Sequence, residues 1–278
     1  MRCLIFPGQG VQRRGMGADL FARFPDITTL ADDILGYSIE QLCTRDPDRR
    51  LRDTRYGQPA VFVVNAMMGM RQIADGAGDY QFFAGHSLGE YNALVAAGVL
   101  DFPTALRIVE QRGALMAGIT GGGMSAVQGV PAAFVRRALQ EAGLTQVHIA
   151  NYNADTQTTI AGDRTEVAVA AKAIGALPGA RVVPINVSGP FHTPLMAPVE
   201  PALRAVLANC TFGTATGSVV SSVNGEIFDP ESGADLLAGQ VCAPVQWVRA
   251  VTTLRASGVT HFDEVNGGTL SALVSRIH

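Results

Sequence analysis

Residues 80–89 read Tyr80-Gln81-Phe82-Phe83-Ala84-Gly85-His86-Ser87-Leu88-Gly89 and join an apolar run to a glycine-rich turn. A helix-period pattern follows Gly89, so the segment predicts a strand, a sharp turn and a helix. Glycines on both sides of Ser87 allow such a turn and expose the hydroxyl at its tip. The G-x-S-x-G spacing therefore predicts a serine nucleophile; the alternative is an ordinary serine in a glycine-rich turn.

Short apolar runs that end at or near glycine recur along the chain, at residues 3–6, 80–84 and 219–223. They alternate with segments of helical period, a pattern typical of α/β proteins with a mainly parallel sheet. We therefore expect a large α/β-hydrolase-like domain formed by residues 1–123 and 190–278.

The order of predicted elements changes between the glycine run at 121–123 and Pro190. We predict strands at 124–130, 147–152, 158–161 and 181–187, and helices at 131–142 and 164–174. This βαββαβ order is that of a ferredoxin-like fold. Residues 124–189 are thus expected to form a small subdomain inserted into the large one, with a ligand cleft between the two.

Composition excludes several classes of function. The 278 residues carry 21 basic and 24 acidic side chains, a net charge of −3, which lacks the positive field that nucleic-acid binding needs. The apolar run at 60–70 is far shorter than the roughly 20 residues of a membrane span. The four cysteines show neither disulfide nor zinc-ligand spacing. We expect a cytoplasmic protein with no bound metal and with no nucleic-acid or membrane partner.

A serine nucleophile needs a base, and the chain has five histidines. His192 is the best candidate, because it follows Pro190-Phe191 where the small subdomain returns the chain to the large one, at the mouth of the predicted cleft. His86 adjoins the serine and should point elsewhere on the turn, and His278 ends the chain. His148 and His261 stand in apolar strand patterns typical of packed or surface histidines.

An arginine interrupts the apolar stripe of the helix predicted at 103–118. At about 100° per residue, Arg112 falls at the centre of a stripe formed by Ile108, Val109, Leu115 and Met116. A buried cation without a partner is costly, so the fold must offer Arg112 either a protein carboxylate or a ligand anion. The helical pattern leaves both alternatives open. A ligand carboxylate could accept two parallel hydrogen bonds from the planar guanidinium, which lysine cannot provide.

Five motifs in one order give the chain a family resemblance. They are Phe6-Pro7-Gly8-Gln9-Gly10, Gly85-His86-Ser87-Leu88-Gly89-Glu90, Val109-Glu110-Gln111-Arg112-Gly113, Pro190-Phe191-His192, and Gln240 followed by Pro244-Val245-Gln246-Trp247. Together they resemble the malonyl-CoA:acyl-carrier-protein transacylases, including the acyltransferases of polyketide synthases. The resemblance covers residues 4 to about 276.

The resemblance implies a role for each motif. Ser87 would be the acyl nucleophile and His192 its base. The backbone N–H groups of Gln9 and Leu88 would form the oxyanion hole. A backbone carbonyl near Gln240 would orient the histidine in place of an acidic residue.

Substrate selection is also implied. Arg112 would bind the malonyl carboxylate, and the bulk of Phe191 would leave little room for an α-branch. The reaction would be ping-pong transfer of malonyl from CoA to the phosphopantetheine thiol of an acyl carrier protein, through a malonyl-serine intermediate. No cofactor is expected, since acyl-CoA is a substrate and phosphopantetheine belongs to the carrier. We expect a monomer.

Two pathways and two rival functions remain open. Gly36-Tyr37-Ser38-Ile39, with Leu42-Cys43 and Asp46-Pro47, resembles discrete, trans-acting polyketide acyltransferases, which favours polyketide over fatty-acid synthesis. One rival is an acyl hydrolase that clears carriers with the same serine and histidine, although such relatives usually lose the arginine. The other is a non-catalytic carrier-binding module.

Arginines cluster near the N-terminus. The cluster consists of Arg13, Arg14, Arg45, Arg49, Arg50, Arg52 and Arg55. These side chains are candidates for a positive surface that docks an acidic carrier; the alternative is an ordinary solvated loop.

Overall fold

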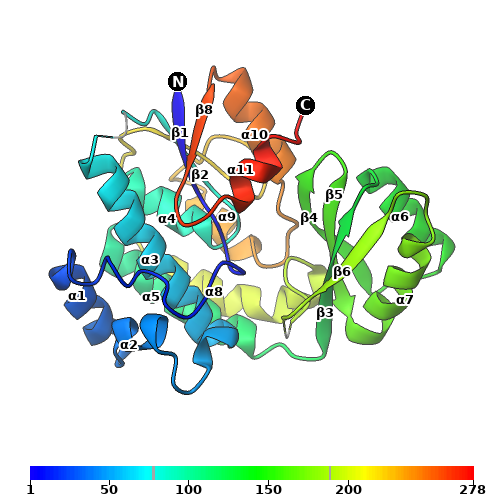
Figure 1. The fold of residues 1–278 in the computed structure, drawn as a ribbon, viewed down its shortest axis with the longest axis horizontal. Helices are drawn as coiled ribbons and strands as arrows, with labels where there is room; N and C mark the ends of the chain where they lie inside the picture. Colours follow the sequence, from blue (N-terminus) through cyan, green and yellow to red (C-terminus); the bar gives the residue numbers. More distant parts are fainter. Residues whose placement is uncertain (77–78, 188) are drawn as a thin grey trace.

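The computed structural model describes residues 1–76, 79–187 and 189–278, whose strands form two sheets (Figure 1). The first sheet has the strand order β7-β2-β1-β8, and every neighbouring pair is parallel. Its strands are β1 (Arg2–Phe6), β2 (Phe82–Gly85), β7 (Ser218–Val220) and β8 (His261–Glu264).

Helices cover both faces of this sheet (Figure 1). The helices of this part of the chain are α1 (Pro25–Leu35), α2 (Ile39–Thr44), α3 (Thr54–Ala74), α4 (Gly89–Ala96), α5 (Phe102–Ala117), α8 (Glu200–Leu207), α9 (Gly233–Gly239), α10 (Trp247–Ala256) and α11 (Thr269–Val274). Two 3-10 helices, η1 (Arg50–Arg52) and η2 (Pro194–Val199), accompany them.

Strand β1 is buried on both faces. Leu4 and Phe6 belong to the core shared with α3, α4 and α5, whereas Cys3 and Ile5 belong to the core shared with α10 and α11. Successive side chains of a strand point to opposite faces, so an uninterrupted apolar strand fits a sheet covered on both sides. This explains why residues 3–6 are apolar without alternation.

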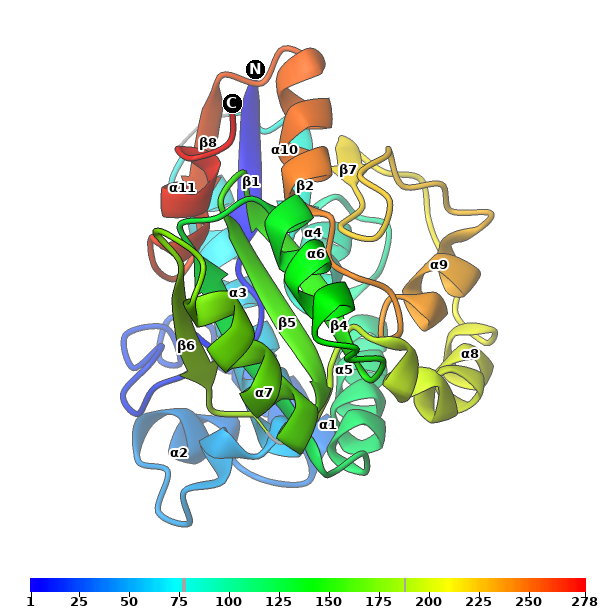
Figure 2. The same ribbon diagram turned by 90° about the vertical axis from the view of Figure 1, so that its right-hand side faces the viewer.

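The second sheet is antiparallel, with the order β4-β5-β3-β6. Helices α6 (Ala132–Glu141) and α7 (Arg164–Gly175) cover one of its faces (Figure 2). The element order β3, α6, β4, β5, α7, β6 is the predicted βαββαβ order. The strands are β3 (Gly122–Gln128), β4 (Val147–Ala154), β5 (Gln157–Asp163) and β6 (Arg181–Ile185).

The α/β class is therefore confirmed, with one parallel and one antiparallel sheet. The domain boundaries at 123/124 and 189/190 stay a prediction. Strand β6 ends at Ile185 rather than at 187, and β7 ends at Val220 rather than continuing to Val223. The chain turns there because Ser221 and Ser222 direct their backbone N–H groups to Glu226 and Glu90 instead of to a strand.

The face of the second sheet without helices turns toward the first sheet. Val127 and Ile160 point into the core under α6 and α7, whereas Met124, Ala126 and Thr159, which have the opposite parity, line a cavity. Backbone hydrogen bonds of 2.8 Å from Val245 to Ala150 and from Tyr152 back to Val245 join β4 to the rest of the chain. The cavity therefore lies between the two sheets.

No helix in the described part of the chain combines the length and the apolar character needed to cross a membrane.

Candidate active site

Ser87 stands at the tip of a sharp turn between β2 and α4. Its φ of 55° is in the left-handed region, which costs a residue with a side chain about 1–2 kcal/mol. A Cβ on Gly85 would lie 1.9 Å from the carbonyl carbon of Gly89, and a Cβ on Gly89 would lie 2.0 Å from the carbonyl oxygen of Phe6. Only glycine fits at either place. The close approach of β1, β2 and α4 thus holds the strained serine in position.

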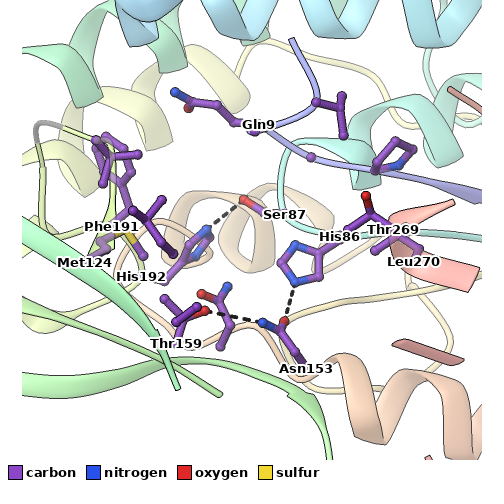
Figure 3. A pocket seen from close by; sticks show the side chains of 18 of the residues that line it. Gln9, His86, Ser87, Met124, Asn153, Thr159, Phe191, His192, Thr269 and Leu270 are labelled. Atoms are coloured by element: carbon purple, nitrogen blue, oxygen red, sulfur yellow. Dashed lines mark hydrogen bonds between the residues drawn. The ribbon is translucent and has the colours of Figure 1, made fainter. Parts of the chain in front are cut away.

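His192 faces Ser87 across the cavity, with its Nε2 atom 2.7 Å from the serine Oγ (Figure 3). The other ring nitrogen, Nδ1, lies 3.0 Å from the backbone carbonyl oxygen of Gln240 and 3.2 Å from that of Ala243. A carbonyl oxygen only accepts, so Nδ1 must carry the hydrogen. Nε2 is then free to accept the serine proton, which is the geometry of a general base.

The imidazole of His192 is held in its neutral form. Burial, followed by the charge of the nearby Arg112, lowers the pKa of His192 to about 3. The ring is therefore uncharged at neutral pH, and its Nε2 atom is able to accept a proton. An anion bound to Arg112 would remove one of the charges that lower this pKa and so strengthen the base.

Arg112, on α5, lies beside Ser87 and is 1% exposed. Its NH1 group donates to Oε1 of Gln58 at 2.5 Å, and NH2 donates to Oε1 of Gln240 at 3.0 Å and to Oγ of Ser87 at 3.1 Å. Its Cζ atom lies 5.7 Å from the centre of the Tyr91 ring. The helical pattern correctly places this cation on the buried face.

The acceptors around Arg112 are neutral. Among the described residues it forms no ion pair with an aspartate or glutamate. Its Nε atom has no hydrogen-bond partner there either. Of the two alternatives that the helical pattern leaves open, a direct internal ion pair is therefore not the one that the structure contains. The guanidinium keeps the capacity to bind a ligand anion next to Ser87.

The backbone N–H groups of Gln9 and Leu88 are the expected oxyanion hole. Neither donates a hydrogen bond to any described residue. Leu88 directly precedes α4, whose N-terminus carries partial positive charge. A Cβ on Gly8 would lie 3.7 Å from the Leu88 nitrogen, so the loop that carries Gln9 runs beside the turn. The Gln9 side chain points away to donate to Thr54 at 3.1 Å.

A cavity of about 530 Å³ surrounds these groups. Phe191, which is 5% exposed, and Met124 of β3 form one wall beside His192 (Figure 3). Thr269 and Leu270 of α11 lie at the opposite side. The predicted site residues Gln9, Ser87, Arg112, Phe191 and His192 all line this one cavity. Leu88 adjoins the cavity as the residue after Ser87, and Gln240 adjoins it through hydrogen bonds to Arg112 and His192.

His86 lies closer to the site than expected. Its Nε2 atom bonds to Oδ1 of Asn153 on β4 at 2.8 Å rather than to Ser87, but its ring also lines the cavity (Figure 3). Burial lowers the pKa of His86, so this ring too is neutral. His86 was expected to point away from Ser87. Its hydrogen bond does go elsewhere, to Asn153, but the ring itself lies in the same cavity as Ser87. His148 lines a different hollow, and His261 and His278 are exposed.

Three side chains that support the site were not predicted from the sequence. Gln58 of α3 anchors the guanidinium, and the amide of Gln240, predicted only for its carbonyl, does the same. Glu90, inside the nucleophile motif, is fully buried beside Gln240. A signal was present in Gln58, which is a polar residue next to the apolar run of α3 and is 1% exposed.

Five of the N-terminal arginines line one depression of about 560 Å³, which we call the arginine hollow: Arg13, Arg14, Arg45, Arg49 and Arg52. Each is exposed, and none forms an ion pair with a described residue. Asp46 also lines the hollow, and Arg50 beside it pairs with Asp48 at 3.0 Å. Gln12 lines both the hollow and the active-site cavity, so the two adjoin.

A serine on a strained turn, a neutral histidine and a buried cation lie within one cavity, an arrangement suited to acyl transfer. Residues 3–266 match the family model of the acyl transferase domain, and the chain belongs to this family. The predicted enzyme class, an acyltransferase, is thereby confirmed.

Known proteins narrow the resemblance. The chain is 41% identical to the polyketide biosynthesis malonyl CoA-acyl carrier protein transacylase of Bacillus subtilis, over 98% of this chain and 96% of that protein. The crystal structure of a malonyl CoA-acyl carrier protein transacylase from Burkholderia pseudomallei superimposes with a TM-score of 0.96 at 37% identity, covering 100% and 97% of the two chains. The structure of a malonyl-transacylase in complex with a polyketide acyl-carrier protein superimposes with a TM-score of 0.93 at 36% identity, covering 99% of this chain and 92% of that one. The resemblance to malonyl-CoA:acyl-carrier-protein transacylases is confirmed.

Proposed function

We propose that this enzyme transfers a malonyl group from CoA to the phosphopantetheine thiol of an acyl carrier protein through a malonyl ester of Ser87. The observation that carries the proposal is the position of Arg112, a buried guanidinium 3.1 Å from the nucleophilic oxygen and without a carboxylate partner in the described chain. The names of the relatives agree with this substrate.

In the first half-reaction, Oγ of Ser87 attacks the thioester carbonyl of malonyl-CoA while Nε2 of His192 takes the hydroxyl proton. A carbon–oxygen bond forms, and the negative charge moves to the carbonyl oxygen, where the N–H groups of Gln9 and Leu88 donate to it. The carbon–sulfur bond then breaks. The departing CoA sulfur takes the proton from His192, leaving a malonyl ester on Ser87.

In the second half-reaction the same atoms work in reverse. The phosphopantetheine thiol gives its proton to Nε2 of His192 and attacks the ester carbonyl. The carbon–oxygen bond to Ser87 breaks, and its oxygen recovers the proton from His192. The acyl carbon keeps its oxidation state in both half-reactions, so no redox step and no bound cofactor are required.

Arg112 selects the acyl group. The two carbonyl carbons of a malonyl group are separated by one methylene, so the free carboxylate must lie close to the ester oxygen. A guanidinium that already contacts Oγ of Ser87 is placed for such a short dicarboxylate. A charge-assisted hydrogen bond of this kind contributes about 1.5–3 kcal/mol, roughly tenfold to 150-fold in preference over an acetyl group.

A polyketide carrier is the proposed partner. The relatives at 41% and 39% identity are named polyketide biosynthesis transacylases, which favours this pathway over fatty-acid synthesis. The arginine hollow offers a positive surface beside the cavity for an acidic carrier. We further propose that the enzyme acts as a monomer in the cytoplasm, where CoA thioesters are available.

Product analysis tests the proposal against its rivals. The purified enzyme is incubated with malonyl-CoA and holo carrier, and malonyl carrier and free malonate are both quantified. A transferase yields malonyl carrier. Release of free malonate without malonyl carrier would instead identify a hydrolase, and binding of the carrier without turnover would identify a non-catalytic module. Polyketide and fatty-acid holo carriers in separate reactions test the pathway.

A further inference from the structure

Glu90 is a fully buried acid that the proposed reaction does not use. It lies in the first turn of α4, three positions after the nucleophile, and its side chain is 0% exposed. Oε2 accepts hydrogen bonds from the backbone N–H of Ser222 at 3.2 Å, from its hydroxyl at 2.7 Å and from Nε2 of Gln240 at 2.8 Å. The other oxygen, Oε1, has no partner among the described residues. Burial raises the pKa of this carboxyl, whereas the hydrogen bonds that Oε2 accepts from Ser222 and Gln240 favour its charged form. A carboxylate buried this deeply calls for compensating positive charge.

Gln240 links this acid to the substrate-binding cation. Its Nε2 donates to Glu90, and its Oε1 accepts from NH2 of Arg112 at 3.0 Å. The orientation of the amide follows from chemistry, because a guanidinium only donates and a carboxylate only accepts. The three side chains form a cation–amide–anion chain in which two buried opposite charges are joined without touching.

The intervening amide has a consequence for binding. A direct ion pair would occupy the edge of the guanidinium that a ligand carboxylate needs. One amide of separation keeps the attraction between the charges in the low-dielectric interior and leaves that edge accessible. The negative charge of Glu90 thus partly offsets the positive charge of Arg112 when no substrate is bound.

We propose that Glu90 is a positioning residue that, through Gln240, limits how strongly Arg112 holds the malonyl carboxylate. The inference rests on the proposed function. Malonyl stays on Arg112 from the loading of Ser87 until the malonyl carrier leaves, so both events share this contact. Excess binding would lower KM without accelerating chemistry and would slow product release. By offsetting part of the positive charge, Glu90 keeps the contact reversible.

The test separates KM from kcat. Glu90→Gln removes the charge but keeps the shape and an oxygen that can accept from Gln240. We expect KM for malonyl-CoA to fall on the order of tenfold and kcat for transfer to the carrier to fall with it. Loading of Ser87 from acetyl-CoA, which has no carboxylate, should be unchanged. Glu90→Asp retains the charge and should restore values near those of the unmodified enzyme.

Ser222→Ala is the matched control. It removes a hydrogen bond from Glu90 without removing the charge, so KM for malonyl-CoA should stay near the unmodified value. If Ser222→Ala reproduces the kinetics of Glu90→Gln, Glu90 serves only to hold the Ser222 turn and the inference fails. It also fails if Glu90→Gln raises KM for malonyl-CoA, or changes malonyl and acetyl loading equally.

A double variant keeps the inference testable even if Glu90→Gln does not fold. Arg112→Ala alone leaves a buried acid without its cation, so adding Glu90→Gln should raise the unfolding temperature of Arg112→Ala and leave its acyl preference unchanged. A further fall in the unfolding temperature would overturn the inference. Failure of the unmodified enzyme to form a malonyl ester on Ser87 would contradict the proposed function instead.

Discussion

The imidazole of His192 takes its orientation from the backbone of Gln240, whose carbonyl oxygen accepts a hydrogen bond from Nδ1 at 3.0 Å. A carboxylate occupies the equivalent place in a Ser-His-Asp triad. The neutral carbonyl selects the same tautomer but adds no full negative charge beside the ring. Because the acceptor is a backbone atom, it survives substitution of the Gln240 side chain.

Substitutions at these two positions should therefore behave differently. His192→Ala is expected to slow acylation of Ser87 from both malonyl-CoA and acetyl-CoA by about 10²–10⁴-fold, since the base serves both donors. Gln240→Ala keeps the backbone carbonyl but removes an anchor of Arg112, so it should slow malonyl loading more than acetyl loading. Rapid-quench acylation with each donor measures this, and equal losses in Gln240→Ala would contradict it.

Arg112→Ala should remove the preference for malonyl over acetyl. The ratio of kcat/KM for the two donors is expected to fall by roughly tenfold to 150-fold, mainly through slower malonyl loading, with acetyl loading retained or increased. Competition between the two CoA esters reports the ratio. An unchanged ratio would show that the guanidinium has only a structural role.

The acid limb of the pH profile should depend on Arg112. Burial and then the Arg112 charge lower the pKa of His192 to about 3. The proposed mechanism needs a neutral His192, so activity should be lost as the pH falls through this pKa. Removing the cation raises the pKa, and the acid limb of acetyl loading should move to higher pH in Arg112→Ala. A limb that stays in place or moves to lower pH would mean that Arg112 does not influence the base.

The arginine hollow should affect the second half-reaction alone. Arg13→Ser/Arg49→Ser is expected to raise KM for the holo carrier by roughly tenfold at low salt, and the difference should shrink as salt screens the charges. Loading from malonyl-CoA should not change. Arg107→Ser/Arg249→Ser, at two exposed arginines outside the hollow, is the control. Equal effects on both half-reactions would assign the hollow to the phosphates of CoA.

Phe191 should exclude branched acyl groups. Its ring packs at the cavity wall next to His192, and Phe191→Ala opens space there. Since one methyl group in a tight apolar pocket changes specificity by about 10–200-fold, methylmalonyl loading should rise relative to malonyl by a factor in this range. Parallel assays with the two CoA esters check this. A constant ratio would place the wall elsewhere.

Local patterns account for what the sequence could predict. The period-2 and period-3.6 patterns of 124–187 set the βαββαβ order, because each element buries its own apolar face. Ser87 was visible because its turn requires glycines at fixed spacing, and Arg112 because a cation broke an apolar stripe.

Contacts distant in sequence could not be predicted in the same way. Gln58 and Gln240 lie 54 and 128 residues from Arg112, and only the packing of α3 and the segment after α9 against α5 brings them to the guanidinium. The sequence predicted that Arg112 pairs with either a protein carboxylate or a ligand anion. The structure instead places an amide between the arginine and Glu90, an arrangement that no helical pattern encodes.

Intact-protein mass spectrometry tests the central claim most directly. The unmodified enzyme mixed with malonyl-CoA should gain the mass of one malonyl group, lose it again when holo carrier is added, and show the same mass on the carrier. Ser87→Ala should gain nothing. An adduct that persists in Ser87→Ala, or an unmodified enzyme that stays at its original mass, would contradict acyl transfer through Ser87.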